Sequence, residues 1–222
     1  MDAGASRPAA NVAVIFTGGD PVPPAALALV PADAFVIAAD SGLHHVDAGR
    51  GVDLVIGDFD SVDADALDAA VSSGALLERH PEAKDHTDLE LALRAAVGRG
   101  FTSVVVVGGY GGRVDHFLTN ALLLGSVEFS DLAITAYVGA ARIIVVRTRT
   151  EVDGRPGELC SLLAVGGPAR AVRTTGLLYP LDGEDLLPGS SRGVSNQLTA
   201  PLATVSIEAG ALLAVQPDFG GT

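Results

Sequence analysis

The sequence predicts an α/β protein in which an N-terminal doubly wound, mostly parallel sheet with helices on both faces is followed by a small C-terminal antiparallel β-sandwich. In the first half, short all-apolar runs alternate with helical patterns, as expected of parallel strands covered on both faces. In the second half, short β-branched segments separated by Gly, Pro or Asp-Gly turns follow one another without a strong helical pattern. We place the boundary near residue 127, giving domains 1–127 and 128–222.

The first half alternates predicted strands with predicted helices. The strands are Val12–Thr17, Ala34–Ala39, Asp53–Ile56, Ala75–Glu78 and Ser103–Val107. The helices are Pro24–Leu29, Gly42–Arg50, Ala64–Ser72 and Thr87–Arg99. Asp63 is a candidate cap for the third helix, and Thr87 with Glu90 forms a capping-box pattern for the fourth. Repeated strand–helix units form a parallel sheet, and ligands then bind at the carboxyl ends of its strands.

The second half contains only predicted strands. They are Leu132–Val138, Arg142–Val146, Glu158–Val165, Arg170–Thr175, Leu198–Ile207 and Ala211–Val215. Turn sequences such as Asp153-Gly154 separate them, and this pattern is typical of an antiparallel sandwich.

Composition and charge exclude several classes of function. Against 27 acidic residues there are 14 basic ones, giving a net charge of −13, and the phosphates of a nucleic acid would be repelled over most of such a surface. No apolar stretch reaches the roughly 18 to 20 residues of a membrane span. Residues 1–11 lack the pattern of a secretory signal, and the single Cys160 has no cysteine partner. We therefore expect a cytoplasmic protein with neither a membrane nor a nucleic-acid partner.

The segment Gly57-Asp58-Phe59-Asp60-Ser61 follows the apolar run Leu54–Ile56. Two carboxylates flanking one Phe repel each other unless a cation or hydrogen-bond donors compensate. A structural turn is one explanation. A site for Mg²⁺, which takes oxygen ligands and bridges to substrate phosphates, is the one we favour.

Acidic and basic residues also follow the neighbouring strands. Asp40 comes at the end of the second strand, where it caps the next helix or joins a ligand site. Lys84 and Asp85 lie just before the fourth helix, where the Lys can reach a phosphate and the Asp a metal or a hydroxyl. Asp88 falls in the first turn of that helix, where the macrodipole alone accounts for an anion.

A glycine-rich loop, Gly108–Gly112, follows the most apolar strand and leads into Arg113, Asp115 and His116. Glycines let the backbone approach a ligand closely, and the helix that starts near Arg113 presents its N–H groups to the same place. The guanidinium of Arg113 suits phosphate oxygens. Four groups of residues thus follow strands of one sheet: Asp40, Gly57–Ser61, Lys84–Asp88 and Gly108–His116. We expect them to converge on an acidic cleft for Mg²⁺-assisted phosphoryl transfer.

These segments resemble those of thiamine pyrophosphokinases, also called thiamine diphosphokinases. The matching segments are Ala39–Gly42, Gly57–Ser61, Lys84–Asp88 with Leu89–Leu93 behind it, and Gly108–His116 with Asn120. In the second half, Gly176–Leu181 and Gly193–Asn196 look like the family's thiamine-domain signatures. Their order and separation agree with the family, and the resemblance covers nearly the whole chain.

The resemblance implies a kinase that transfers the β,γ-diphosphate of ATP to the hydroxyethyl group of thiamine, giving thiamine diphosphate and AMP. It implies an α/β catalytic domain, a β-sandwich domain, and a homodimer with the active site between subunits. Mg²⁺ would be the cofactor, ATP the co-substrate and thiamine the acceptor.

The resemblance also assigns roles to residues of this chain. Asp58, Asp60 and Asp85 would hold Mg²⁺ and, together with Asp88 and Arg113, would form the catalytic set. The nucleotide would be bound by Asp40, Lys84, Gly109, Gly111, Gly112, Arg113, Asp115 and His116, and thiamine by Ser195 and Asn196. Asp85 is the candidate for the base that accepts the proton of the thiamine hydroxyl.

Two other functions stay open at this point. A pyrophosphokinase acting on a hydroxymethyl pterin would use the same acidic cleft, but the β-rich second half with Ser195-Asn196 disfavours it. A non-catalytic protein that senses thiamine diphosphate or a nucleotide is the other. It is disfavoured because so many acidic motifs are costly to hold together without a cation.

Overall fold

The computed structural model describes residues 11–47, 49–81 and 85–219. The chain forms two compact units, Met1–Gly112 and Arg113–Thr222. The division falls before the helix that follows the glycine loop, whereas the strand pattern of the sequence places a domain boundary after residue 127. None of the helices in the described ranges is long and apolar enough to cross a membrane.

The first unit is built on a parallel sheet with the strand order β5-β1-β2-β3-β4. Its strands are β1 (Val12–Thr17), β2 (Phe35–Ala39), β3 (Leu54–Gly57), β4 (Leu76–Arg79) and β5 (Ser103–Gly108). Ile15 lies beside Ile37 on one neighbouring strand and Val106 on the other, and all three are buried. Because the strands are parallel, the loops that follow them meet at one edge of the sheet.

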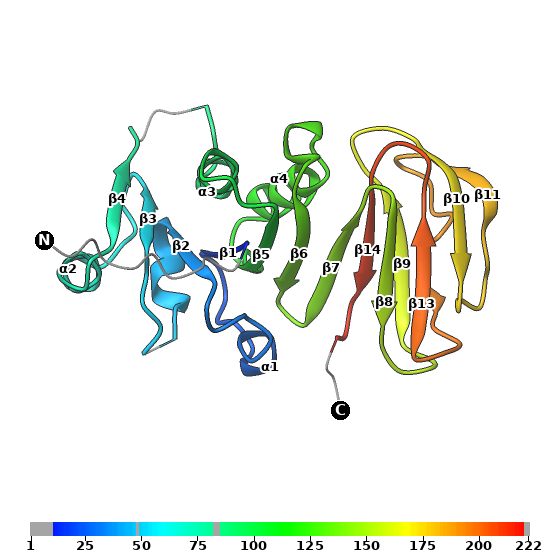
Figure 1. Ribbon diagram of the computed structural model, residues 1–222, viewed down its shortest axis with the longest axis horizontal. Helices are drawn as coiled ribbons and strands as arrows, with labels where there is room; N and C mark the ends of the chain where they lie inside the picture. Colours follow the sequence, from blue (N-terminus) through cyan, green and yellow to red (C-terminus); the bar gives the residue numbers. More distant parts are fainter. Residues whose placement is uncertain (1–10, 48, 82–84, 220–222) are drawn as a thin grey trace, which may run out of the picture. The chain divides into compact units, whose positions relative to one another are not determined.

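Helices cover both faces of this sheet, as the sequence predicts. In Figure 1, α3 (Asp88–Gly98) lies above the sheet and α1 (Pro24–Leu27) lies below it. The helix α2 (Ala64–Ser72) and the 3₁₀ helix η1 (Asp40–His45) share a buried cluster with β2 and β3. That cluster contains Ala38, Leu43, Val55, Phe59 and Ala75, with Leu67 packed against it.

The prediction of a helix over Gly42–Arg50 is wrong. Among the described residues of this range, 42–47, 49 and 50, the only helix is the end of the 3₁₀ helix η1, and Val46 is already extended, with φ −72° and ψ 127°. Gly42 is pressed against β1, since a Cβ built on it would lie 2.1 Å from the carbonyl oxygen of Phe16. This close contact with the sheet is a tertiary constraint that the local pattern does not carry.

Both predicted N-caps are present. The side chain of Asp63 accepts a hydrogen bond from the amide of Ala66 at 3.0 Å, and α2 begins at Ala64. Thr87 caps α3 by accepting from the amide of Glu90 at 3.2 Å. The carboxylate of Glu90 pairs with Arg94 at 3.0 Å.

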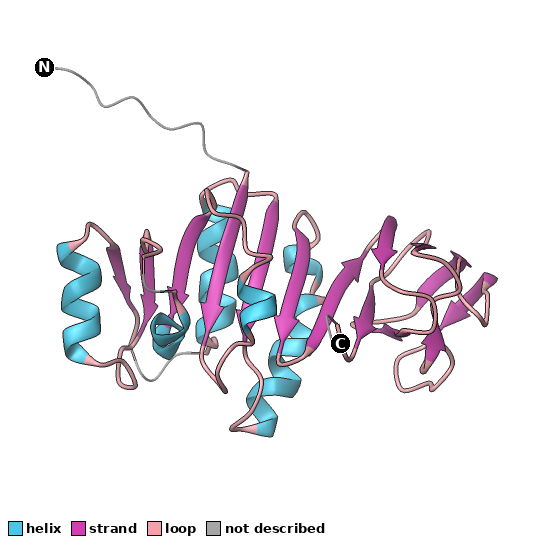
Figure 2. Ribbon diagram, turned by 90° about the horizontal axis from the view of Figure 1, so that it is seen from below, coloured by secondary structure: helices cyan, strands magenta, loops and turns pink. Residues whose placement is uncertain are grey.

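The second unit begins with α4 (Val114–Leu124) and the short 3₁₀ helix η2 (Val127–Phe129). Beyond η2 it consists of strands, turns and loops (Figure 2). Two antiparallel layers have the orders β12-β9-β14-β7-β6 and β11-β10-β13-β8. The strands are β6 (Ala133–Val138), β7 (Ala141–Val146), β8 (Arg149–Asp153), β9 (Leu159–Ala164), β10 (Ala169–Thr175), β11 (Asp182–Leu186), β12 (Asn196–Gln197), β13 (Leu202–Ser206) and β14 (Leu212–Gln216).

One buried cluster joins the two layers, so the predicted β-sandwich is confirmed. Leu162 and Leu212 come from one layer, and Val172 and Val205 from the other. The sequence pattern misses the strands β8, β11 and β12. Within β8 only Val152 is buried, and β11 reads Asp-Gly-Glu-Asp-Leu, so neither shows the apolar content on which strand prediction relies.

Candidate active site

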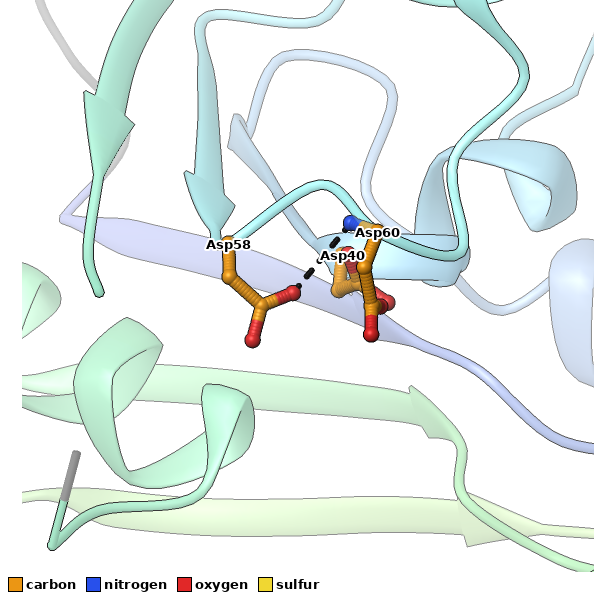
Figure 3. A group of neighbouring side chains, drawn as sticks. All are labelled: Asp40, Asp58 and Asp60. Atoms are coloured by element: carbon orange, nitrogen blue, oxygen red, sulfur yellow. Dashed lines mark hydrogen bonds between the residues drawn. The ribbon is translucent and has the colours of Figure 1, made fainter. Parts of the chain in front are cut away.

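Three carboxylates meet at the carboxyl edge of the parallel sheet. Asp40 follows β2, and Asp58 and Asp60 follow β3. One ligand oxygen from each lies within 4.8 Å of the others. Figure 3 shows the three side chains converging, with the backbone amide of Asp60 donating to Oδ1 of Asp58 at 3.3 Å. The convergence expected for these three residues is therefore present in the described part of the chain.

The turn that carries Asp58 and Asp60 is held by the residue between them. Phe59 has φ +67°, a left-handed conformation that costs a non-glycine residue roughly 1–2 kcal/mol. Its ring is buried in the cluster with Leu43 and Val55. With the Phe side chain directed into the core, Asp58 and Asp60 both project from the turn. Backbone strain of this kind persists only where packing enforces it.

Asp40 is the buried member of the group. It is 7% exposed and has φ +47°. Its Oδ1 is buried without a hydrogen-bond donor among the described residues. A buried carboxylate oxygen beside two further carboxylates is unfavourable without positive charge. This oxygen-only donor set fits Mg²⁺, which accepts carboxylates and completes its shell with water or phosphate.

Asp88 lies against the same group. A Cβ built on Gly57 would lie 3.1 Å from Cβ of Asp40 and 3.2 Å from Oδ1 of Asp88. Asp88 is the first residue of α3, so the amino end of this helix faces the carboxylate cluster. The absence of a side chain at Gly57 is what allows Asp40 and Asp88 to come this close.

Of the three predicted metal ligands, Asp58, Asp60 and Asp85, only Asp85 lies outside the carboxylate group. It is exposed in the loop before α3 and is not a member of the group formed by Asp40, Asp58 and Asp60. Its assignment as a metal ligand and base stays a prediction. Lys84 lies outside the described residues.

The glycine loop packs against the loop that follows β1. The amide of Gly109 donates to the carbonyl of Gly18 at 2.8 Å, and the amide of Asp20 donates to the carbonyl of Tyr110 at 2.7 Å. Gly109, Gly111 and Gly112 all have positive φ. A Cβ built on Gly111 would lie 2.2 Å from the carboxylate of Asp20. Glycine is therefore required at position 111 by a close approach as well as by its φ.

Sequence reasoning missed Asp20 and His45 at this edge. Asp20 follows β1 after Gly18-Gly19, and this glycine pair directly after an apolar strand is a signal that could have found it. His45 is in contact with the end of β1, where its Nδ1 lies 2.9 Å from the carbonyl oxygen of Thr17. That contact crosses from η1 to β1, and no local pattern predicts it.

Arg113 and Asp115 belong to the second unit, where they form an exposed two-point ion pair. The Arg113 Nη2 to Asp115 Oδ2 distance is 2.6 Å, and Nε to Oδ1 is 3.2 Å. Hydrogen bonding from Arg113 lowers the pKa of Asp115 to about 2, and the same pair raises the pKa of Arg113. His116 is exposed in the first turn of α4. Arg113 therefore has fork geometry suited to an anion, and Asp115 occupies it here.

The predicted thiamine residues differ sharply in exposure. Ser195 is exposed, has φ +57°, and its amide donates to Oγ of Ser161 at 3.0 Å. Asn196 is 2% exposed. Its Nδ2 donates to the carbonyl of Tyr179 at 2.7 Å, and its Oδ1 accepts from the amide of Tyr179 at 2.9 Å. Asn196 thus holds the loop that carries the exposed ring of Tyr179.

Comparison with protein-family models gives two matches in chain order. Residues 27–136 match the model described as "Thiamin pyrophosphokinase, catalytic domain", and residues 144–212 match "Thiamin pyrophosphokinase, vitamin B1 binding domain". The first match contains the Asp40, Asp58 and Asp60 group, and the second contains Tyr179 and Asn196.

Individual relatives agree with these matches. The thiamine pyrophosphokinase of Bacillus subtilis (strain 168) is 28% identical over 180 residues, which are 80% of this chain and 80% of that protein. Thiamine pyrophosphokinase 1 of Arabidopsis thaliana is 25% identical over 162 residues, or 69% of this chain and 61% of that protein.

Solved structures show the same fold. The crystal structure of thiamine pyrophosphokinase from Bacillus subtilis has a TM-score of 0.79 at 24% identity, covering 94% of this chain and 99% of that one. That of the Geobacillus thermodenitrificans thiamin pyrophosphokinase has a TM-score of 0.76 at 25% identity, covering 95% and 99%.

Proposed function

This chain belongs to the thiamine pyrophosphokinase family, and from that premise we propose that it transfers the diphosphate group of ATP to the hydroxyethyl group of thiamine with Mg²⁺ as cofactor. The observation that carries the proposal is Oδ1 of Asp40, which is buried beside Asp58 and Asp60 and has no hydrogen-bond donor in the described part of the chain. A bound cation would compensate this oxygen, and a metal–nucleotide complex is what diphosphate transfer requires.

The carboxylates of Asp40, Asp58 and Asp60 would hold the metal, with Asp88 beside them. When bound, Mg²⁺ supplies charge neutralisation for the phosphate oxygens. The backbone of the glycine loop lies at the same sheet edge, and its positive-φ residues leave room for a phosphate chain against the main chain. Arg113 would exchange its contact with Asp115 for phosphate oxygens.

The reaction needs no covalent intermediate on the protein. The thiamine hydroxyl oxygen attacks the β-phosphorus, the bond from that phosphorus to the α,β-bridging oxygen breaks, and AMP leaves with that oxygen. A carboxylate near the hydroxyl accepts its proton, and exposed Asp85 in the loop before α3 is our candidate.

Thiamine would be received by the second unit. We infer that Ser195 contacts it directly, whereas Asn196 acts through the loop that carries Tyr179. The exposed Tyr179 ring then offers an aromatic face to a cationic ligand. We further propose a cytoplasmic homodimer with the active site between subunits, and no membrane or nucleic-acid partner.

The test is a product assay with purified protein, Mg²⁺, ATP and thiamine. AMP and thiamine diphosphate are expected in equal amounts. Formation of ADP, or the lack of thiamine-dependent AMP, overturns the proposal. Replacing thiamine by a hydroxymethyl pterin tests the alternative acceptor in the same assay.

A further inference from the structure

Arg79 makes two contacts with the turn that carries the metal-site carboxylates. It is the last residue of β4 and lies opposite Gly57 of β3 in the sheet. Its Nη1 donates to the carbonyl oxygen of Asp58 at 2.9 Å. Its guanidinium carbon lies 4.7 Å from the centroid of the Phe59 ring. One side chain therefore contacts both the backbone and the side chain of this turn.

The turn needs such support because its backbone is strained. Phe59 has φ +67°, a left-handed conformation that is unfavourable for a non-glycine residue. Burial of the ring against Leu43 and Val55 opposes that relaxation. Arg79 opposes it too, because rotation at Phe59 would move both the Asp58 carbonyl and the Phe59 ring away from the guanidinium. A guanidinium over an aromatic face is attracted by the electrons of the ring, so this contact stabilises the observed position of Phe59.

Relaxation of the turn would change the geometry of the cation site. Asp58 and Asp60 flank Phe59, so a change of φ at this residue alters the separation of their carboxylates. Mg²⁺ demands nearly ideal octahedral geometry and tolerates little displacement of its ligands. Groups that orient metal ligands without touching the metal typically contribute 10- to 100-fold to metal affinity.

We propose that Arg79 is a positioning residue: through the Asp58 carbonyl and the Phe59 ring it holds Asp58 and Asp60 in the arrangement that binds the divalent cation. This rests on the proposed function only in taking the carboxylate group as the cation site. Arg79 was not singled out by the sequence, because its role depends on the pairing of β3 with β4.

Arg99 is a matched control within the same unit. Its Nη1 donates to a backbone carbonyl, that of Ala95, at 3.2 Å, and its guanidinium carbon lies 6.0 Å from the centroid of the Phe35 ring. Phe35 begins β2, whereas Asp40 follows the end of that strand. Arg99→Met removes the same charge and the same two kinds of contact, and in addition an ion pair with Oε1 of Glu78 at 2.5 Å, so it is the more severe of the two substitutions.

The experiment titrates the full chain with Mn²⁺ and follows free Mn²⁺ by electron paramagnetic resonance, without nucleotide or thiamine. Arg79→Met is expected to weaken Mn²⁺ binding about tenfold. Arg79→Lys is expected to weaken it less, since Lys keeps a donor but has no planar face for the ring. Arg99→Met is expected to stay within about twofold of the wild-type protein.

Wild-type Mn²⁺ affinity in folded Arg79→Met overturns the proposal, as does a wild-type protein that binds no Mn²⁺. Weaker binding of a non-hydrolysable ATP analogue with unchanged Mn²⁺ affinity also overturns it, by making Arg79 a phosphate ligand. If Arg79→Met does not fold, as judged by circular dichroism, Arg79→Lys is titrated instead. A wild-type Mn²⁺ affinity in Arg79→Lys then overturns the proposal. Because no turnover is measured, failure of the product assay leaves this test intact.

Discussion

The side chain of Asn196 contacts both polar groups of the Tyr179 backbone, donating to its carbonyl oxygen at 2.7 Å and accepting from its amide at 2.9 Å. Asn196 also accepts from its own neighbour, the amide of Gln197, at 2.9 Å. The family resemblance implies that Asn196 contributes to the thiamine pocket. Its 2% exposure and its bonds to the Tyr179 backbone instead favour an indirect contribution, through the position of the Tyr179 loop.

Asn196→Asp is expected to destabilise the protein. The buried carboxylate would keep the acceptor toward the Tyr179 amide but would face the Tyr179 carbonyl without a donor, which costs about 1–3 kcal/mol. Urea unfolding measures the change in free energy. Ser195→Ala is the control, because Ser195 is exposed, and it should leave the unfolding midpoint within error. Equal stability of Asn196→Asp and wild type would contradict the assigned contacts.

Asp40→Asn is expected to leave the fold intact and to weaken divalent-metal binding by more than the roughly 10- to 100-fold that is typical of residues which only orient the ligands. Asn tolerates the positive φ of this position, and the substitution removes one of three mutually repelling carboxylates. The metal-free protein should therefore unfold at the same temperature as wild type or above it, while the stabilisation by added Mg²⁺ is lost. Differential scanning calorimetry with and without Mg²⁺ measures both effects. Asp33→Asn is the control, because Asp33 is exposed. If Mg²⁺ raises the unfolding temperature of Asp40→Asn as much as that of the wild type, Asp40 is not part of the metal site.

Gly108→Ala is expected to destabilise the first unit far more than Gly112→Ala. Both residues have positive φ, so both substitutions carry backbone strain of about 1–2 kcal/mol. A Cβ at Gly108 would in addition lie 2.2 Å from the backbone oxygen of Thr17, whereas nothing lies within 4 Å of one at Gly112. Overpacking against backbone adds about 1–3 kcal/mol, measurable by chemical denaturation. Equal losses for the two variants would show that the close approach of β5 to β1 is not a constraint.

The thiol of Cys160 is expected to be unreactive in the folded protein. It is fully buried in the sandwich, and burial raises its pKa to about 11. Reaction with a thiol-specific disulfide reagent at pH 8 should occur only at the rate of unfolding. Since the folded pKa is raised, the contribution of this thiol to stability is complete below the ordinary pKa near 9 and is lost as pH rises toward 11. Rapid labelling of native protein at pH 8 would contradict this.

Local patterns in the sequence predict most of the first unit. The apolar runs of β1 and β5 are recognised because parallel strands are buried on both faces, and Asp63 and Thr87 are recognised as caps by their place before helical patterns. Prediction fails where long-range contacts override the local pattern. At η1, the contact between Gly42 and β1 prevents the expected helix. At β8 and β11, backbone pairing forms strands from polar residues.

The features of the candidate site also divide into those that the sequence predicts and those that only the structure shows. The chemistry of Asp58 and Asp60, and the expectation that Asp40 and Asp88 lie near them, follow from the order of strands and the acids after them. Two features required the packed structure: the buried Asp40 oxygen, which none of the described residues donates to, and the close approach of Asp88 to Gly57. So did Asp20, whose carboxylate lies where a side chain of Gly111 would be.

The sequence by itself determined the two-part architecture, the family and the acidic character of the site, because these depend on residue type and on spacing along the chain. Only the tertiary structure decided which carboxylates form one group and which residues hold them in place. Arg79 contacts Asp58 and Phe59 because β3 and β4 pair. Asn196 binds the backbone of Tyr179, which lies 17 residues earlier in the chain. Such contacts join residues that are distant in the chain, and their energies depend on burial and distance, which a linear pattern does not contain.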